Sequence, residues 1–386
     1  MWQRAITHQV LKALEQIEYG SLHVTTPDGV EYSFAGRHEG AHGIMYIQDW
    51  RTLPALVFRG DIGFAEAYRD GWWDADDLAS LLLAGVQNQP VFKNNLYGST
   101  VARSVARLCY LLTPNTLRGS KRNIHAHYDL GNEFYQLWLD DSMTYSSALF
   151  RTGEESLRYA QLNKYDRMLD RLNTKSGQLL EIGCGWGGLI DRATKTGDFN
   201  IKGITLSQQQ HDYATRRVGD SATIALEDYR HQRGGYDHII SIEMFEAVGE
   251  RFWPIYFQKL KSLLNRNGKA VIQTITIGDE HFERYRKGAD MIRTFIFPGG
   301  MLPSPSRFKA EAEKYGLRVT DHFEFGMDYA VTLQHWLAAF ESKKQQILAL
   351  GFDQPFIRLW RFYLAGCISS FKAGQTSVMQ VELQHA

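Results

Sequence analysis

Residues 181–188 read Glu-Ile-Gly-Cys-Gly-Trp-Gly-Gly and close a short apolar segment that begins near residue 177. Glycines let the backbone turn tightly and let a ligand approach without a Cβ in the way. A helix that follows such a turn presents free N–H groups at its start. No lysine follows these glycines, which excludes an ATP-type phosphate loop. We therefore predict a strand, a ligand-binding turn and a helix, in that order.

The segments around this turn alternate between helix and strand patterns. A polar helix is predicted over 154–173. Runs with strand character recur at 201–207, 223–229, 236–246 and 270–277. Strands that alternate with helices at this spacing are typical of βαβ units and a parallel sheet. The predicted fold class is therefore α/β for the larger part of the chain.

The first third of the chain has a different pattern. We predict a helix over 4–18 and a hairpin that turns at Pro27-Asp28-Gly29. A strand over 43–50 and one helical segment over 65–86 follow. This part is predicted to be mixed α and β.

Composition excludes several classes of protein. The chain has 386 residues, 43 basic and 43 acidic side chains, and a net charge of zero. A nucleic-acid binder that works through bulk charge is therefore excluded. The 3 cysteines are too few and too far apart for a disulfide framework or a structural zinc site. With no signal peptide and no apolar run long enough to span a bilayer, we predict a cytoplasmic protein without a metal.

One interval is locally basic. No Asp or Glu lies between Asp77 and Asp129. The interval carries Lys93, Arg103, Arg107, Arg118, Lys121 and Arg122. A surface helix with a solvated basic edge would produce this pattern, and so would a surface that contacts anionic phospholipid headgroups.

Seven segments match the order and spacing of one protein family. They are HYDLGNEFYQLWLDDSMTYSSALF (127–150), EIGCGWGG (181–188), GITLSQQQ (203–210), EDYR (227–230), MFEAVG (244–249), FIFPGG (295–300) and FGMDYAVTLQHW (325–336). Together they resemble the cyclopropane fatty acid synthase and mycolic acid methyltransferase family, which belongs to the class I S-adenosylmethionine-dependent methyltransferases. The resemblance implies a Rossmann-like doubly wound methyltransferase sheet in a catalytic domain over 116–386.

A further segment resembles only some members of that family. The stretch GDIGFAEAYRDGWWDADDL at 60–78 is similar to the N-terminal domain of the longer, phospholipid-acting members. It implies a smaller mixed α+β, lipid-associated domain over 1–115. The resemblance also suggests a homodimer and a peripheral association with the phospholipid membrane surface.

The resemblance assigns a cofactor site residue by residue. Tyr145 and Ser146 would cover the methionine end of S-adenosylmethionine, and Gly183 and Gly185 would lie against the cofactor. The ribose and adenine side would involve Thr205, Leu206, Gln210, Leu226 and Glu227. Leu206 and Leu226 are also ordinary core residues, and Gln210 could be a solvated helix position.

The chemistry that the resemblance implies is methyl transfer to an isolated alkene. An alkene is a poor nucleophile, so the transfer needs close alignment in a dry pocket. The resulting carbocation must then lose a proton. Loss from the added methyl group closes a cyclopropane ring, whereas loss from the chain leaves a methyl-branched or methylene product. The position of the base therefore decides the product.

In the resembled family a bound bicarbonate acts as that base. The positions of its cage correspond here to Ser147, Glu246, Gln273, Ile275 and Tyr329. Ser147 replaces a Cys of the family and Gln273 replaces a His. Glu246 could instead take the proton itself, or only order a helix start or the cofactor ammonium. Tyr329 could steady the cation or be a packed phenol, and Glu243 is a lesser candidate three residues before Glu246.

The sequence thus favours one function. The predicted enzyme transfers a one-carbon unit from S-adenosylmethionine to the cis double bond of an unsaturated phospholipid acyl chain and forms a cyclopropane. A methyl-branched or methylene product remains open because the bicarbonate cage is altered. Two different function classes also remain open, namely a small-molecule methyltransferase and a lipid-binding protein without turnover.

Overall fold

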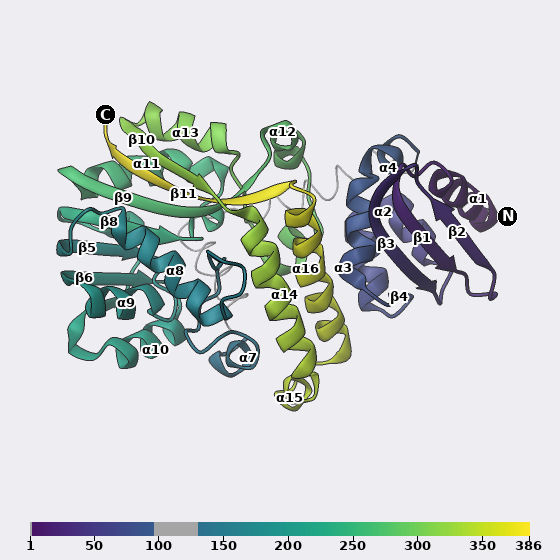
Figure 1. Cartoon of the computed structure of the whole chain (residues 1–386), viewed down its shortest axis with the longest axis horizontal. Helices are drawn as coiled ribbons and strands as arrows, with labels where there is room; N and C mark the ends of the chain where they lie inside the picture. Colours follow the sequence, from purple (N-terminus) through teal and green to yellow (C-terminus); the bar gives the residue numbers. More distant parts are fainter. Residues whose placement is uncertain (1, 96–129) are drawn as a thin grey trace. The chain divides into compact units, whose positions relative to one another are not determined.

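The computed structural model describes residues 2–95 and 130–386, which form two compact units (Figure 1). Among these residues, the first unit comprises 2–95, 287–296 and 333–375, and the second comprises 130–286, 297–332 and 376–386. The predicted domain boundary at 115/116 lies outside the described residues. The same holds for Arg103, Arg107, Arg118, Lys121 and Arg122 of the predicted basic interval.

The first unit contains a four-stranded sheet in the order β2-β1-β3-β4. Its strands are β1 (Tyr19–Thr25), β2 (Glu31–Ala35), β3 (His38–Ile47) and β4 (Trp73–Ala75). β1 pairs antiparallel with β2 and parallel with β3, and β4 pairs antiparallel with β3. The β1–β2 connection confirms the predicted hairpin, and Gly29 provides the left-handed backbone of its turn with a φ of 80°.

Helices from both ends of the chain belong to this unit. They are α1 (Trp2–Leu14), α2 (Thr52–Arg69), α3 (Leu78–Gln87), α4 (Gln89–Asn95), α15 (Lys344–Ala349) and α16 (Gln354–Lys372). α16 packs against α2 and α3. The single helix predicted over 65–86 is wrong, because Gly71 has a φ of 74° and the chain then forms β4. Trp73 of that strand is fully buried and stacks on Phe64, with ring centroids 4.1 Å apart.

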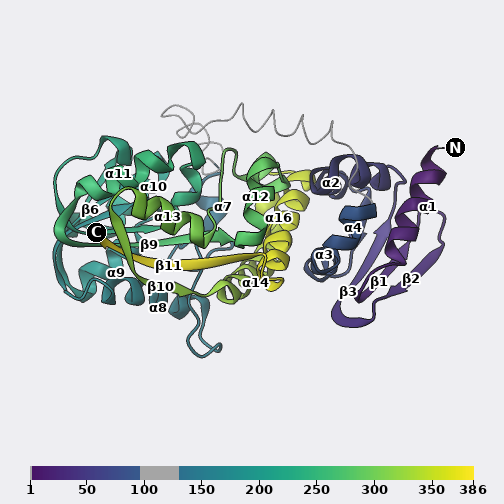
Figure 2. The same cartoon turned by 90° about the horizontal axis from the view of Figure 1, so that it is seen from above.

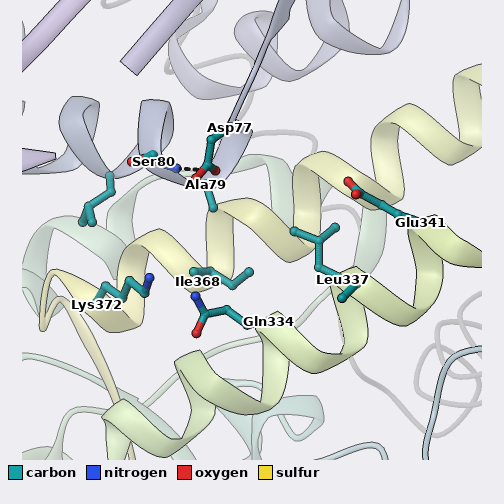
Figure 3. Close-up of a pocket in the computed structure, with 10 residues that line it drawn as sticks. Asp77, Ala79, Ser80, Gln334, Leu337, Glu341, Ile368 and Lys372 are labelled. Atoms are coloured by element: carbon teal, nitrogen blue, oxygen red, sulfur yellow. Dashed lines mark hydrogen bonds between the residues drawn. The ribbon is translucent and has the colours of Figure 1, made fainter. Parts of the chain in front are cut away.

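A hollow of about 220 Å³ lies within the first unit. Figure 3 shows the start of α3 on one side and α14 (Gly326–Ser342) with α16 on the other. Its two acidic side chains have structural partners: Asp77 caps α3 by accepting from the Ser80 N–H at 3.0 Å, and Glu341 pairs with Arg361 at 2.7 Å. None of the residues predicted for the site lines this hollow.

The second unit contains a seven-stranded sheet in the order β10-β11-β9-β8-β5-β6-β7 (Figure 1). Its strands are β5 (Ser176–Ile182), β6 (Asp198–Thr205), β7 (Thr223–Leu226), β8 (Tyr236–Ile242), β9 (Leu264–Ile277), β10 (Leu317–Glu324) and β11 (Thr376–His385). β5 to β9 are parallel, and β11 lies antiparallel between β9 and β10. The predicted α/β fold with a doubly wound sheet is confirmed.

Alternate residues of the central strands face two different helical layers. Leu179 packs in a cluster with α8 (Leu157–Asp170) and α9 (Gly188–Thr196), and its neighbour Leu180 packs with α11 (Trp253–Leu263) and α13 (Pro305–Lys314). The remaining α-helices of this unit are α7 (Asn132–Gln136), α10 (Gln208–Val218), most of α12 (Asp279–Lys287) and the first part of α14, residues 326–332 (Figure 2). Because both faces are covered, the loops at the strand ends are left to carry the chemistry.

Within the described parts of the chain, every helix is too short or too polar to cross a membrane.

Candidate active site

A cavity of about 160 Å³ opens at the carboxyl ends of the parallel strands. Residues directly after β5, β6, β7 and β8 line it, together with residues 143–146. β5 lies between β6 and β8. After β5 the chain forms β6 and β7 on one side of it, and then β8 and β9 on the other side. Ligands of doubly wound sheets bind at such a switch point.

The glycine turn forms one wall of the cavity. Gly183 and Gly185 have φ angles of 83° and 51°, which side chains other than glycine rarely adopt. The Gly183 and Cys184 N–H groups donate to the Ile204 carbonyl oxygen at 3.0 Å, which fixes the turn against β6. A Cβ on Gly185 would meet nothing within 4 Å, so this backbone faces open space that a ligand can fill.

The end of β6 and the start of α10 carry three of the predicted cofactor residues, Thr205, Leu206 and Gln210, and all three line the cavity. The Thr205 hydroxyl donates to Gln210 Oε1 at 2.8 Å, and both side chains are buried. Ser207 caps α10 by accepting from the Gln210 N–H. Gln210 is therefore held in the wall and is not a solvated helix position.

The loop after β7 supplies Glu227 but not Leu226. Glu227 lines the cavity and pairs with Lys202 at 3.0 Å, which lowers the pKa of its carboxyl group. Leu226 is the last residue of β7, is 41% exposed and does not line the cavity.

Three further residues of the Glu-Asp-Tyr-Arg segment also line the cavity, namely Asp228, Tyr229 and Arg230. Asp228 and Arg230 form an ion pair at 2.6 Å. The segment was part of the resemblance, so the motif itself was the signal for these residues, although only Glu227 was assigned.

A buried lysine contacts a residue predicted for the methionine end of the cofactor. Tyr145 and Ser146 both line the cavity, and Lys164 of α8 donates to Ser146 Oγ at 2.6 Å. Lys164 is completely buried, and this desolvation lowers its pKa to about 7. Lys164 was not predicted from the sequence, because nothing in the polar pattern of 154–173 separates it from the exposed charges beside it.

Glu181 provides an acceptor that has no partner. It lines the cavity at the end of β5, and its Oε2 atom is buried without a hydrogen bond from the described residues. Burial raises the pKa of Glu181 to about 8, against the opposing charge of Lys164. An ammonium group in the cavity would satisfy this oxygen.

Two half-buried glutamates, Glu243 and Glu246, lie in the segment after β8. Glu243 follows β8, lines the cavity and has a φ of 48°. Its Oε1 accepts from the Ser147 N–H at 2.9 Å and from Gln273 Nε2 at 2.8 Å, and its Oε2 accepts from the Tyr329 hydroxyl at 2.7 Å. Three of the five residues predicted to be catalytic thus meet at Glu243.

The other two, Glu246 and Ile275, form a separate contact. Glu246 Oε1 accepts from the Ile275 N–H at 2.5 Å and from the Thr274 hydroxyl at 3.0 Å. Burial, and next the charge of Glu243, raise the pKa of Glu246 to about 8. Glu246 is not among the described residues that line the cavity. The lesser candidate, Glu243, is therefore the carboxylate nearer to a ligand.

A chain of hydrogen-bonded polar side chains runs from α8 through β11 and β9 to Glu243. Arg167 of α8 donates to Gln380 Oε1 at 2.7 Å, Gln380 Nε2 donates to Gln273 Oε1 at 2.9 Å, and Gln273 donates to Glu243. Arg167 and Gln380 were not predicted from the sequence, because the strand β11 that carries Gln380 was not predicted.

Comparison with known proteins places the chain in a family. Residues 115–381 match the family described as mycolic acid cyclopropane synthetase. The chain belongs to this family. The predicted resemblance is thereby confirmed, and the protein is an S-adenosylmethionine-dependent methyltransferase.

Individual relatives agree with this assignment. The chain is 36% identical over 346 residues to tuberculostearic acid methyltransferase UfaA1 of Mycobacterium tuberculosis, covering 83% of this chain and 78% of that protein. It is 32% identical to cyclopropane-fatty-acyl-phospholipid synthase of Escherichia coli K12, covering 84% of each. The solved structure of mycolic acid cyclopropane synthase CmaA1 with SAH and CTAB superposes with a TM-score of 0.64 at 34% identity, over 68% of this chain and 98% of that chain.

The residues of the cavity fit S-adenosylmethionine. The unsatisfied Glu181 oxygen suits the cofactor ammonium, the open face of Gly185 admits the part of the cofactor that lies against the backbone, and the polar wall of Thr205, Gln210 and Glu227 suits the nucleoside. When bound, S-adenosylmethionine supplies an electrophilic methyl group on a sulfonium.

Proton release on binding tests the role of Glu181. In the free protein its pKa near 8 keeps Glu181 largely protonated at pH 7. A ligand ammonium favours the carboxylate, so binding of S-adenosylhomocysteine should release a proton, and affinity should rise with pH until about pH 8. Calorimetry at pH 7 in two buffers of different ionisation enthalpy measures this release.

The matched variant is Glu181→Gln. It should lose the proton release and bind S-adenosylhomocysteine about 10- to 100-fold more weakly, the size expected for a hydrogen bond to a charged group. An unchanged proton release in this variant would assign the titration to another residue.

Proposed function

We propose that the protein transfers a one-carbon unit to the cis double bond of an unsaturated phospholipid acyl chain and that proton loss then closes a cyclopropane ring. The observation that carries the proposal is the carboxylate of Glu243, which lines the cavity and accepts hydrogen bonds from three buried residues. Methylation of an alkene creates a carbocation, and a desolvated carboxylate both stabilises this charge and accepts the proton.

The walls of the cavity favour this chemistry. Met143, Met244 and Val248 line the same cavity as Glu243 and give it apolar surface. Apolar surface disfavours water, which would otherwise capture a carbocation as an alcohol. Tyr329 holds Glu243 through its hydroxyl and is itself buried, so the acceptor is kept in one position.

The length of the matching region supports a phospholipid substrate. The phospholipid synthase of Escherichia coli matches 84% of this chain, whereas cyclopropane mycolic acid synthase 1 matches 70%. The extra match includes part of the N-terminal region. Together with the acid-free basic interval before Asp129, it supports a peripheral association with an anionic membrane surface.

A second product is favoured by a specific observation. Ser147 and Gln273 differ from the Cys and His of the resembled family, and both contact Glu243. A displaced acceptor would remove a proton from the chain instead of the added methyl group. The product would then be a methylene or methyl-branched acyl chain, and the similarity to a tuberculostearic acid methyltransferase agrees with this alternative.

Lipid analysis distinguishes the products. We expect that expression in a bacterium without such an enzyme adds the mass of one methylene group to mono-unsaturated phospholipid acyl chains. Proton NMR should show loss of the olefin signal and a new upfield cyclopropane signal. A mass gain with a retained or shifted olefin signal would favour the methylene product. No mass gain, together with methylation of a soluble amine, would contradict the proposed function.

Vesicle binding tests the membrane proposal. The protein should sediment with vesicles that contain anionic phospholipid at low salt and be released at about 1 M salt, where the Debye length falls to about 3 Å. The double variant Arg103→Gln, Arg107→Gln should bind more weakly at low salt by up to ~2 kcal/mol, about 1 kcal/mol for each charge. Equal binding of the variant and the native protein would exclude these two charges from the contact.

A further inference from the structure

The donors that the family resemblance assigns to bicarbonate are already engaged by this chain. The Ser147 N–H, the Gln273 side-chain amide and the Tyr329 hydroxyl all donate to Glu243, and the Ile275 N–H donates to Glu246. A carboxylate and a bicarbonate present the same planar pair of oxygens to such donors. The arrangement therefore does not fit a bound bicarbonate in addition to Glu243.

The direction of the hydrogen bonds shows which group must be the acceptor. Arg167 can only donate, so the Gln380 oxygen faces Arg167, and the Gln380 amide NH₂ faces the Gln273 oxygen. The Gln273 amide NH₂ is then left to point at Glu243. The ion pair of Arg167 with Asp321 at 3.0 Å anchors the start of this chain. At the other end of the chain the Gln273 N–H needs an oxygen that accepts a hydrogen bond, and an ionised carboxylate provides one.

The backbone at Glu243 is strained. Its φ of 48° lies in the left-handed region, which glutamate seldom adopts. The Glu243 N–H donates to the Gln273 carbonyl oxygen at 2.8 Å, which ties the residue to the end of β9. Strained residues of this kind concentrate at functional sites, where the surrounding structure holds them in place.

The charges around Glu243 are suited to one ionised and one neutral glutamate. Burial raises the pKa of Glu243, and the charge of Lys164 and the three hydrogen-bond donors oppose this rise. Glu246, with a pKa raised to about 8 and with Oε2 lacking a partner among the described residues, is suited to hold a proton at neutral pH. Two neighbouring carboxyl groups with separated pKa values divide the roles of acceptor and acid.

We propose that Glu243 occupies the place that the resemblance assigns to bicarbonate and is itself the proton acceptor of the reaction, an inference that rests on the proposed function. The alkene π-electron pair forms the new carbon–carbon bond, and the electron pair of the broken carbon–sulfur bond stays on sulfur. The neighbouring chain carbon becomes positive. A Glu243 oxygen takes a proton from the added methyl group, and the freed C–H pair closes the ring. Neutral Glu243 returns its proton to water after the product leaves.

Glu243→Gly provides the decisive test. Glycine accepts the left-handed backbone and removes the carboxylate; relief of the backbone strain offsets part of the cost of leaving three donors without an acceptor, so the variant should remain folded. It should bind S-adenosylhomocysteine normally and lose methylation activity at least ~100-fold, the contribution of a positioned base. Its emptied cage should bind ¹³C-labelled bicarbonate in an NMR titration, and added bicarbonate should restore part of the activity. The native protein should neither bind bicarbonate nor depend on it.

Two variants serve as controls. Glu243→Gln keeps the size of the side chain, so it should be inactive and should not respond to bicarbonate. Asn173→Gly relieves a second left-handed residue, with a φ of 58°, at an exposed turn after α8. It should retain full activity, which separates the effect of backbone relief from the loss of the carboxylate.

The outcomes separate the two proposals. Bicarbonate binding by the native protein, or full activity of Glu243→Gly without bicarbonate, would overturn the role of Glu243. A native protein that produces no modified acyl chain would overturn the proposed function and with it the role of Glu243 as acceptor. In that case, bicarbonate binding by Glu243→Gly alone would still establish that the carboxylate fills the cage.

Discussion

The carboxylate of Glu243, held by three donors at the wall of the cavity, is the interaction on which the chemistry of this protein depends. Each donor comes from a different part of the second unit: Ser147 from the segment before α8, Gln273 from β9 and Tyr329 from α14. A single buried charge would be costly in this position, and the donors together with Lys164 offset that cost. The same contacts hold a backbone conformation that glutamate does not favour by itself.

The order of the strands brings this carboxylate to the cofactor. β5 and β8 are neighbouring parallel strands. The glycine turn after β5 and Glu243 after β8 therefore lie together at the carboxyl ends of the strands. The antiparallel strand β11 then carries Gln380 to Gln273, and α8 carries both Lys164 and Arg167 to the same region. The same strand ends thus carry the residues that bind the cofactor and the residue that accepts the proton.

Sequence patterns were sufficient for the parallel strands β5 to β9 and for most of the residues that line the cavity, because both follow from local motifs such as the glycine turn. They were insufficient for Glu243, because its importance depends on a backbone angle. In a continuous helix Glu243 and Glu246 would share a face, but the positive φ at Glu243 turns it toward Ser147 while Glu246 turns toward Ile275. The helix predicted over 65–86 failed for a similar reason, since burial of Trp73 in a strand outweighs helical periodicity.

The most direct measurement is a crystal structure of the native protein with S-adenosylhomocysteine and an unsaturated phospholipid analogue. We predict a Glu243 oxygen within about 3–4 Å of the carbon next to the double bond or of the position of the transferred methyl group, with no ion between them. A bicarbonate between Glu243 and the acyl chain, or a Glu243 side chain turned away from it, would contradict the role of Glu243 as proton acceptor.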